Sequence, residues 1–204
     1  MSKFQTTEQQ ACYGIGRQIG QQLTEQSFDG FDLSAVQQGI EDAIKNAPFA
    51  VSHEQIGEAF RILNEKMAAE EAVRAETMKA AGAEFLVENA KRSEVKVTES
   101  GLQYEVLVAG SGKQPAASDK VRVHYHGTFT DGKVFDSSVQ RGQPAEFPVG
   151  GVIAGWVEAL QLMSEGAKWK LFIPHNLAYG EHGAGSIPPF STLVFEVELL
   201  NVLA

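Results

Sequence analysis

Apolar residues recur every three or four positions through the first part of the chain, which is the spacing of one face of an α-helix. The pattern predicts one helix over about residues 7–26 and another over about 33–46, with a turn at Phe28–Phe31. Their apolar stripes are Tyr13, Ile15, Ile19 and Leu23 on the first, and Val36, Ile40 and Ile44 on the second. A helical segment this small cannot bury so much apolar surface alone, so we expect it to self-associate, most simply as a two-fold dimer.

A third helix is predicted to begin at Ser52, because Ser52 and Gln55 have the spacing of a capping box. Its helical composition continues to about Arg92, which gives about 40 residues and a length of about 60 Å. The segment Ala68–Thr77 is mostly alanine and charged residues. A helix that is polar all round usually crosses solvent between two bodies, and we prefer this interpretation. The alternative is a helix packed along a second domain.

The second part of the chain alternates apolar and polar residues, the pattern of half-buried β-strands. Strands are predicted at Val121–Tyr125 and Thr192–Val202, with shorter ones near 134–138, 145–149 and 168–173. A turn at Thr130–Lys133 and a short helix near Trp156–Met163 lie between them. In the last strand Leu193, Phe195, Val197 and Leu199 share one face. We therefore predict an α+β fold, in which an antiparallel sheet wraps around one short helix.

Composition changes near residue 94 and supports this division. The segment 1–94 has 9 Lys/Arg against 15 Asp/Glu and one proline, whereas 95–204 has 8 against 11 and holds both tryptophans, six prolines and thirteen glycines. Proline and glycine punctuate short strands, and segments poor in them favour helices. The predicted domains are a helical dimerisation module at 1–50, a long connecting helix at 51–94, and a mainly β domain at 95–204.

Charge and composition exclude several classes of protein. The net charge of −9 disfavours nucleic-acid binding, which normally needs a basic face. No stretch approaches the roughly 20 apolar residues of a membrane span, and the first residues show no signal peptide, so we expect a cytoplasmic protein. One cysteine, Cys12, excludes a disulfide framework; a buried position is preferred over pairing between chains.

Two further patterns suggest ligand sites only weakly. Gly14, Gly16 and Gly20 resemble a dinucleotide-binding motif, but no strand precedes them and their spacing is wrong. His124 and His126 share one strand face, yet two imidazoles without a third ligand are poor evidence for a metal. A solvated sheet face is the preferred interpretation, and we expect no metal or other cofactor.

Five runs in the second part are more specific. They are Val121-Arg-Val-His-Tyr-His-Gly127, Asp131-Gly-Lys-Val-Phe-Asp-Ser-Ser138, Val152-Ile-Ala-Gly-Trp-Val-Glu158, Leu177-Ala-Tyr-Gly180 and Ile187-Pro-Pro-Phe-Ser-Thr-Leu-Val-Phe-Glu-Val-Glu-Leu-Leu200. In this order they closely resemble the FKBP-type peptidyl-prolyl cis–trans isomerases, the macrolide-binding immunophilins. The helical first half resembles the amino-terminal extension of the Mip-like subfamily, whose helical modules dimerise. Lacking a signal peptide, the chain resembles a cytoplasmic relative.

The resemblance implies a role for each of the site residues. An apolar pocket is expected from Tyr125, Phe135, Val152, Ile153, Trp156 and Phe195, with Trp156 as its floor and Phe147 nearby. Tyr179 and the backbone N–H of Ile153 would donate hydrogen bonds to substrate carbonyls. Asp136 would be an acceptor at the pocket edge with Arg141 and Tyr125 as partners, and Ile187 would line the loop over the substrate. Isolated aromatics are usually ordinary core, but this many at the family's positions favour a pocket.

The implied reaction is rotation about X–Pro bonds in folding proteins, which breaks no bond to a heavy atom and obliges no proton to move. A pocket that favours the twisted amide suffices, so a general acid or base role for Asp136 is disfavoured. Expected partners are unfolded or partly folded proteins that contain proline, macrolide inhibitors and a second copy of the chain. The alternative is a non-catalytic scaffold or chaperone. Ala145, Ser186 and the loop Glu181–Gly185 depart from common family residues and affect specificity.

Overall fold

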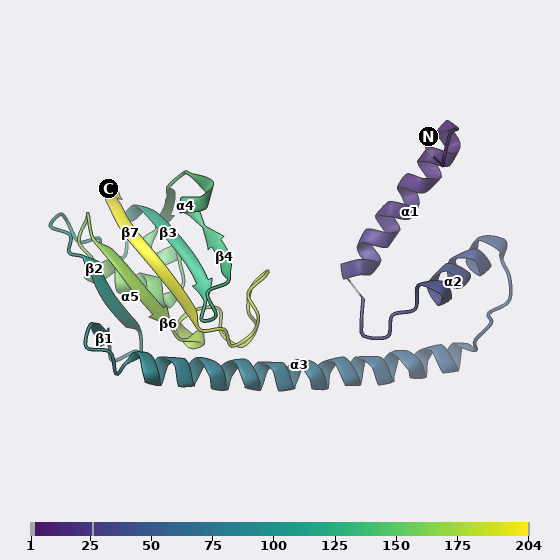
Figure 1. The fold of residues 1–204 in the computed structure, drawn as a ribbon, viewed down its shortest axis with the longest axis horizontal. Helices are drawn as coiled ribbons and strands as arrows, with labels where there is room; N and C mark the ends of the chain where they lie inside the picture. The colour runs from purple at the N-terminus through teal and green to yellow at the C-terminus, as the bar shows by residue number, and fades with distance from the viewer. Residues whose placement is uncertain (1–2, 26, 204) are drawn as a thin grey trace. The chain divides into compact units, whose positions relative to one another are not determined.

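The computed structural model describes residues 3–25 and 27–203 and divides into two compact units, Met1–Ala69 and Glu70–Ala204 (Figure 1). Among the described residues, no helix is both long and apolar enough to cross a membrane. The first unit is helical and the second contains all the strands described, as the composition predicted. The boundary between the units falls within one long helix.

The first unit contains helices α1 (Thr7–Glu25) and α2 (Leu33–Lys45) and the beginning of α3 (His53–Asn89). The predicted ranges of α1 and α2 are confirmed to within one residue, apart from Gln26, which lies outside the described residues; α3 ends at Asn89, three residues before its predicted end. The side chain of Asp32 caps α2 by accepting hydrogen bonds from the backbone of Ser34 and Ala35. The three glycines of the rejected dinucleotide motif lie inside α1.

The apolar stripes of α1 and α2 remain largely uncovered in the single chain. Tyr13 is 55% exposed and Ile44 is 77% exposed. Cys12 is exposed as well, so the expectation that it is buried is wrong for one chain. A folded protein rarely leaves such contiguous apolar surface in water without a partner for it.

Helix α3 begins at a reciprocal capping box, as predicted. The Ser52 N–H donates to Gln55 Oε1 at 3.1 Å, and the Gln55 N–H donates to Ser52 Oγ at 3.2 Å. The helix runs for 37 residues. Its middle is exposed, including Val73, as expected for the polar segment Ala68–Thr77, whereas one face of its last turns is covered. Within the second unit, Phe85 and Leu86 pack against Phe172 and Val194.

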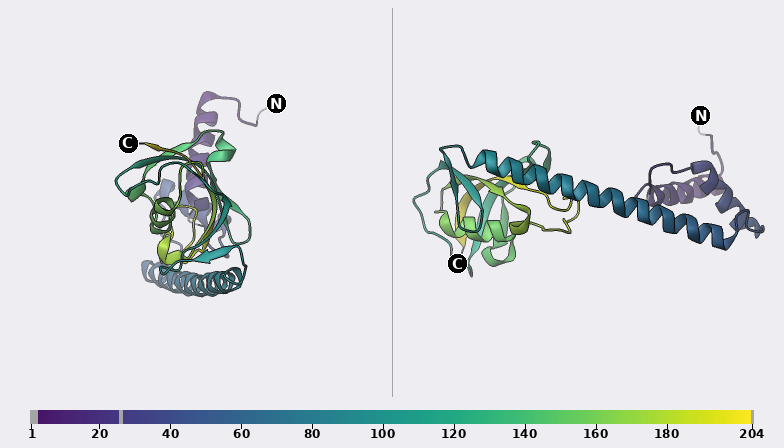
Figure 2. Two further views of the ribbon diagram at one scale, coloured as in Figure 1. Left: turned by 90° about the vertical axis from the view of Figure 1, so that its left-hand side faces the viewer. Right: turned by 90° about the horizontal axis from the view of Figure 1, so that it is seen from below.

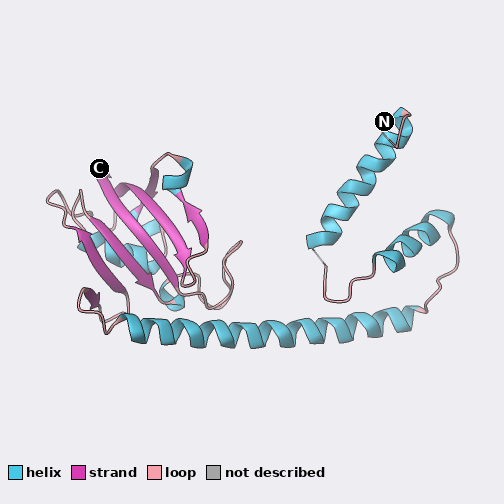
Figure 3. Cartoon of the chain, in the orientation of Figure 1, coloured by secondary structure: helices cyan, strands magenta, loops and turns pink. Residues whose placement is uncertain are grey.

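The second unit contains an antiparallel sheet (Figure 3). Its strand order is β1-β2-β6-β7-β3-β4, and β5 also pairs with β3. The strands are β1 (Val95–Val97), β2 (Gln103–Val108), β3 (Lys120–Phe129), β4 (Val134–Ser137), β5 (Ala145–Pro148), β6 (Lys168–Ile173) and β7 (Leu193–Leu203). Helices α4 (Ser138–Arg141) and α5 (Ala154–Leu162) and the 3₁₀ turns η1 (Val149–Gly151) and η2 (His175–Leu177) lie between them. The strands β1 and β2 were not predicted.

The main core lies between α5 and one face of the sheet (Figure 2). Residues at alternate positions of β6 and β7, such as Leu171, Leu193 and Phe195, point to this face and are buried. Their neighbours Phe172 and Val194 point to the opposite face, where the end of α3 covers them. This arrangement confirms the predicted sheet wrapped around a short helix.

Candidate functional site

A cavity of about 420 Å³ opens at the edge of the main core in the second unit. Its lining residues are Tyr125, Phe135, Asp136, Phe147, Gly151, Val152, Ile153, Trp156, Tyr179 and Phe195. They come from β3, β4, β5, η1, α5, β7 and the segment after η2. Elements far apart in sequence therefore converge on one mostly apolar hollow with few polar groups, the usual form of a small-molecule site.

Trp156 lies at the centre of the aromatic residues that line this cavity. It is only 4% exposed, and its ring is nearly perpendicular to three others. Ring centroids lie 5.5 Å away for Tyr125, 5.9 Å for Phe147 and 5.2 Å for Phe195. Edge-to-face contacts of this kind fix ring orientation, so the wall of the cavity is rigid before anything binds.

Gly127 makes room for the rings of Phe135 and Phe195, which form another part of the cavity wall. It was not among the predicted site residues. A Cβ at this position would lie 2.7 Å from Phe135 Cζ and 2.8 Å from Phe195 Cε1. Phe135 and Phe195 themselves meet edge to face at 5.4 Å. A glycine inside a strand marks a close approach of other atoms, so the sequence carried this signal. Gly151, which also lines the cavity, was missed as well.

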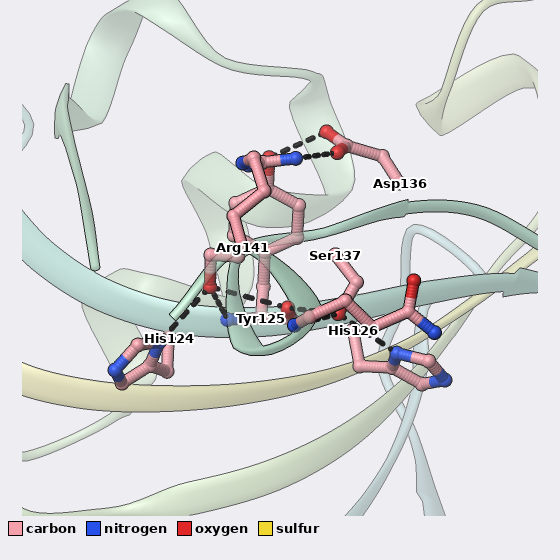
Figure 4. Close-up of polar contacts among 8 residues, drawn as sticks. His124, Tyr125, His126, Asp136, Ser137 and Arg141 are labelled. Atoms are coloured by element: carbon pink, nitrogen blue, oxygen red, sulfur yellow. Dashed lines mark hydrogen bonds and ion pairs between the residues drawn. The ribbon is translucent and has the colours of Figure 1, made fainter. Parts of the chain in front are cut away.

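One polar network lies at the rim of the cavity (Figure 4). The Tyr125 hydroxyl donates to Asp136 Oδ2 at 2.5 Å, and Arg141 Nη2 donates to the Tyr125 oxygen at 2.8 Å. Arg141 Nη1 also forms an ion pair with Asp136, and its guanidinium lies 5.6 Å from the Tyr125 ring centroid. Arg141 does not line the cavity itself; it holds the two residues that do.

The network shifts the pKa values of its members in opposite directions. Burial raises the pKa of the Tyr125 hydroxyl, and its hydrogen bond to the Asp136 carboxylate raises it further. Burial would raise the pKa of Asp136, but hydrogen bonds from Tyr125 and Arg141 outweigh it and hold this pKa below its ordinary value. The hydrogen bond to Asp136 raises the pKa of Arg141. At neutral pH the network therefore has one ionised carboxylate, one cation and a protonated phenol.

We expect kcat/KM for a proline peptide to be nearly constant from about pH 5 to about pH 9. Asp136, with a lowered pKa, stays ionised over this range, and Tyr125, with a raised pKa, keeps its proton. Below this range activity should fall, as Asp136 is protonated and loses its ion pair with Arg141. The measurement is kcat/KM against pH with a non-titrating peptide. A transition centred near neutrality would contradict this assignment, because it requires a titrating group outside the network.

Three of the predicted residues, Arg141 included, lie away from the cavity wall or at its edge. Ile187 is half-buried and packs against the main core, and it does not line the cavity. Tyr179 is 39% exposed at the rim. Ile153 immediately precedes α5, and its carbonyl accepts the N–H groups of Trp156 and Val157. The proposed donor role of its own N–H remains a prediction.

The two histidines of β3 lie on the sheet face opposite to Tyr125. Each is half-buried rather than fully solvated, and its ring contacts a serine of the neighbouring segment. His124 Nδ1 lies 3.1 Å from Ser138 Oγ, and His126 Nδ1 lies 3.0 Å from Ser137 Oγ (Figure 4). These contacts give the rings a structural role that the sequence pattern did not indicate.

Comparison with known proteins covers both units. Residues 111–200 match the family described as FKBP-type peptidyl-prolyl cis-trans isomerase, and residues 8–106 match the domain amino terminal to it. A 22 kDa FKBP-type peptidyl-prolyl cis-trans isomerase of Escherichia coli (strain K12) is 55% identical over 201 residues, covering 98% of each chain.

More distant relatives cover the same length. The outer membrane protein MIP of Legionella longbeachae is 39% identical over 202 residues, covering 97% of this chain and 86% of that protein. The crystal structure of FkpA from Escherichia coli is similar with a TM-score of 0.73 at 38% identity, covering 98% of each chain. Both units are thus found together, in the same order, in these relatives.

Proposed function

Because the chain belongs to the family of FKBP-type peptidyl-prolyl cis–trans isomerases, we propose that the cavity around Trp156 is where it binds and twists the X–Pro bond. The single observation that supports this most is the shape of the cavity: aromatic walls of fixed orientation around about 420 Å³, with polar groups only at the rim. A pyrrolidine ring is small, apolar and rigid, and it matches such a space.

The proposed mechanism follows from what limits the uncatalysed reaction. Amide resonance gives a barrier of about 18–20 kcal/mol to rotation about the bond. A catalyst needs to bind the twisted amide more tightly than the planar one. The apolar wall holds the proline ring and removes the carbonyl group before the proline from contact with water. A less solvated amide loses its charge separation more easily, which favours the twisted form. Asp136 and Arg141 keep Tyr125 in place, and no nucleophile, metal or cofactor is needed.

We expect Tyr179→Phe to lower kcat/KM for a proline peptide about two- to ten-fold, which is the effect expected for the loss of one hydrogen bond to a carbonyl. The assigned role is donation from the rim hydroxyl to the substrate. The matched control is Tyr104→Phe in the same unit, because Tyr104 stacks on Trp169 at 4.3 Å and does not line the cavity. Equal activity of both variants and the wild type would remove Tyr179 from the mechanism.

The proposal extends to the helical unit. The exposed stripes of α1 and α2 support homodimerisation through residues 1–50, which places two isomerase domains in one particle. Two sites in one particle raise the effective concentration for a second contact with the same unfolded chain. We therefore propose chaperone-like binding of unfolded proteins that depends on the dimer. The alternative of a scaffold without catalysis is disfavoured by relatives that are named isomerases.

The aromatic cavity is where macrolide inhibitors of this family would bind, with Ala145 and Ser186 affecting their affinity; competition with a proline peptide tests this. A cytoplasmic location also remains a prediction, which cell fractionation tests.

A further inference from the structure

The segment between η2 and β7 carries Tyr179 and Ile187, and backbone hydrogen bonds at its base and its tip hold it. The Gly180 N–H donates to the carbonyl of His175 at 2.8 Å, and the Phe190 N–H donates to the carbonyl of Gly180 at 2.9 Å. Ala184 and Ile187 exchange two backbone hydrogen bonds of 2.9 Å at its tip. The position of Tyr179 therefore depends on where the base of this loop is held.

Phe190 is the residue that fixes the base of the loop. Its φ is 57°, in the left-handed region that a phenylalanine rarely adopts, and such a conformation persists only where several contacts impose it. Its ring meets the His175 ring nearly edge to face, with centroids 5.1 Å apart. On another side Lys79 of α3 places its Nζ 5.5 Å from the centroid of the Phe190 ring.

The end of α3 is fitted closely to the same region of the second unit. A Cβ at Gly82 would lie 2.4 Å from Thr192 Oγ1, so the helix and the start of β7 touch there. Asn89 Nδ2 donates to Gln103 Oε1 at 2.8 Å, and Gln103 Nε2 donates to the Leu86 carbonyl at 2.9 Å; Asn89 and Gln103 are buried. These contacts hold one face of residues 79–89 against the sheet and the loop.

We propose that the last three turns of α3 form a positioning element for the substrate loop of the isomerase site, with Lys79 and Phe190 as the positioning residues. The chain of contacts runs from Lys79 to the Phe190 ring, from the Phe190 N–H to Gly180, and along the backbone to Tyr179. The inference rests on the cavity being the proline site proposed above. It assigns the long helix a part in substrate binding in addition to its role as a connection.

The proposal predicts a particular kinetic signature. When the loop is less often in its binding-competent position, apparent affinity falls in proportion to the population lost. Once substrate is bound the loop is in place, so turnover at saturation is unaffected. The signature is therefore a raised KM with an unchanged kcat.

The test uses Lys79→Ala and Lys79→Arg in the full chain. A cation over a ring at a partly exposed site corresponds to about a two- to five-fold effect on an equilibrium, so Lys79→Ala should raise KM by this factor and leave kcat unchanged. Lys79→Arg keeps a cation over the ring and should restore KM. Hydrogen exchange of the Phe190 amide should accelerate in Lys79→Ala. Lys66→Ala, on the same helix but in the other unit, is the matched control and should match the wild type.

A second variant tests the helix without touching Lys79. Gly82→Leu forces α3 away from Thr192 and should raise KM at least as much as Lys79→Ala. If both variants keep the wild-type KM while a Trp156 variant loses activity, the positioning role is wrong and the proline site stands. If the Trp156 variant keeps full activity, the assignment of the cavity itself fails.

Discussion

Replacement of Trp156 by leucine is expected to lower kcat/KM for a proline peptide by about ten- to a hundred-fold, with little of the loss explained by unfolding. The indole is the ring that Tyr125, Phe147 and Phe195 all contact edge to face. Leucine removes these contacts and a flat apolar wall, which together are worth about 1.5–3 kcal/mol of binding to the transition state. A factor of ten corresponds to about 1.4 kcal/mol.

The sequence offers a matched control for this experiment in its other tryptophan. Trp169 is also buried in the second unit, where it stacks on Tyr104, but it does not line the cavity. Trp169→Leu should therefore lower the free energy of unfolding by a few kcal/mol, as large-to-small core changes do, and leave kcat/KM within about two-fold of the wild type. Equal losses of activity in the two variants would mean that the effect reports stability and not the site.

The second large effect is expected at the helical unit, where Ile40→Glu should convert the proposed dimer to a monomer. Ile40 lies on the apolar stripe of α2 and is partly exposed in the single chain. Placing a carboxylate in an apolar interface costs about 2–4 kcal/mol, which weakens association by about thirty- to a thousand-fold. Sedimentation of the full chain over a range of concentrations measures the change directly.

Loss of the dimer should affect the isomerisation of a short peptide and the refolding of a whole protein differently. The monomeric variant should isomerise a short peptide as fast as the wild type, because the cavity lies wholly in the second unit. It should lose most of the acceleration of a proline-limited refolding reaction, because one particle no longer offers two sites. Val73→Glu is the matched control, since Val73 is an exposed apolar residue of the polar middle of α3.

A wild-type chain that sediments as a monomer would contradict the dimer proposal outright. If the Ile40→Glu variant is a monomer but still accelerates proline-limited refolding at the wild-type rate, the wild type is a dimer, and dimerisation is not needed for chaperone-like binding.

Most strands could be predicted from the sequence, but β1 and β2, at one end of the sheet, could not. In β3 every second residue is apolar because one face is buried in the main core, so Val121, Val123 and Tyr125 were placed correctly. Strand β1 is three residues long, and β2 has a bulge after Val106 and exposes its last residues. Neither has enough alternation to be recognised.

The contact of α3 with the sheet was missed for a different reason. Besides the apolar residues Phe85 and Leu86, it depends on one glycine that fits against Thr192 and on a buried amide pair, Asn89 and Gln103, from segments fourteen residues apart. Neither a glycine nor a polar pair appears in an apolar stripe. The pocket residues were found through their family resemblance, whereas Gly127 was available from the sequence alone as a glycine inside a strand.

We infer that the cavity around Trp156 accelerates rotation about X–Pro bonds. The most direct measurement is the cis–trans exchange rate of a proline peptide at equilibrium, followed by exchange NMR with catalytic amounts of the full chain, either wild type, Trp156→Leu or Trp169→Leu. We predict exchange far faster than the uncatalysed rate of one event in about 10–100 s for the wild type and Trp169→Leu, and a catalysed rate about ten- to a hundred-fold lower for Trp156→Leu. Exchange in the presence of the wild type at the uncatalysed rate, or undiminished exchange with Trp156→Leu, would contradict this inference.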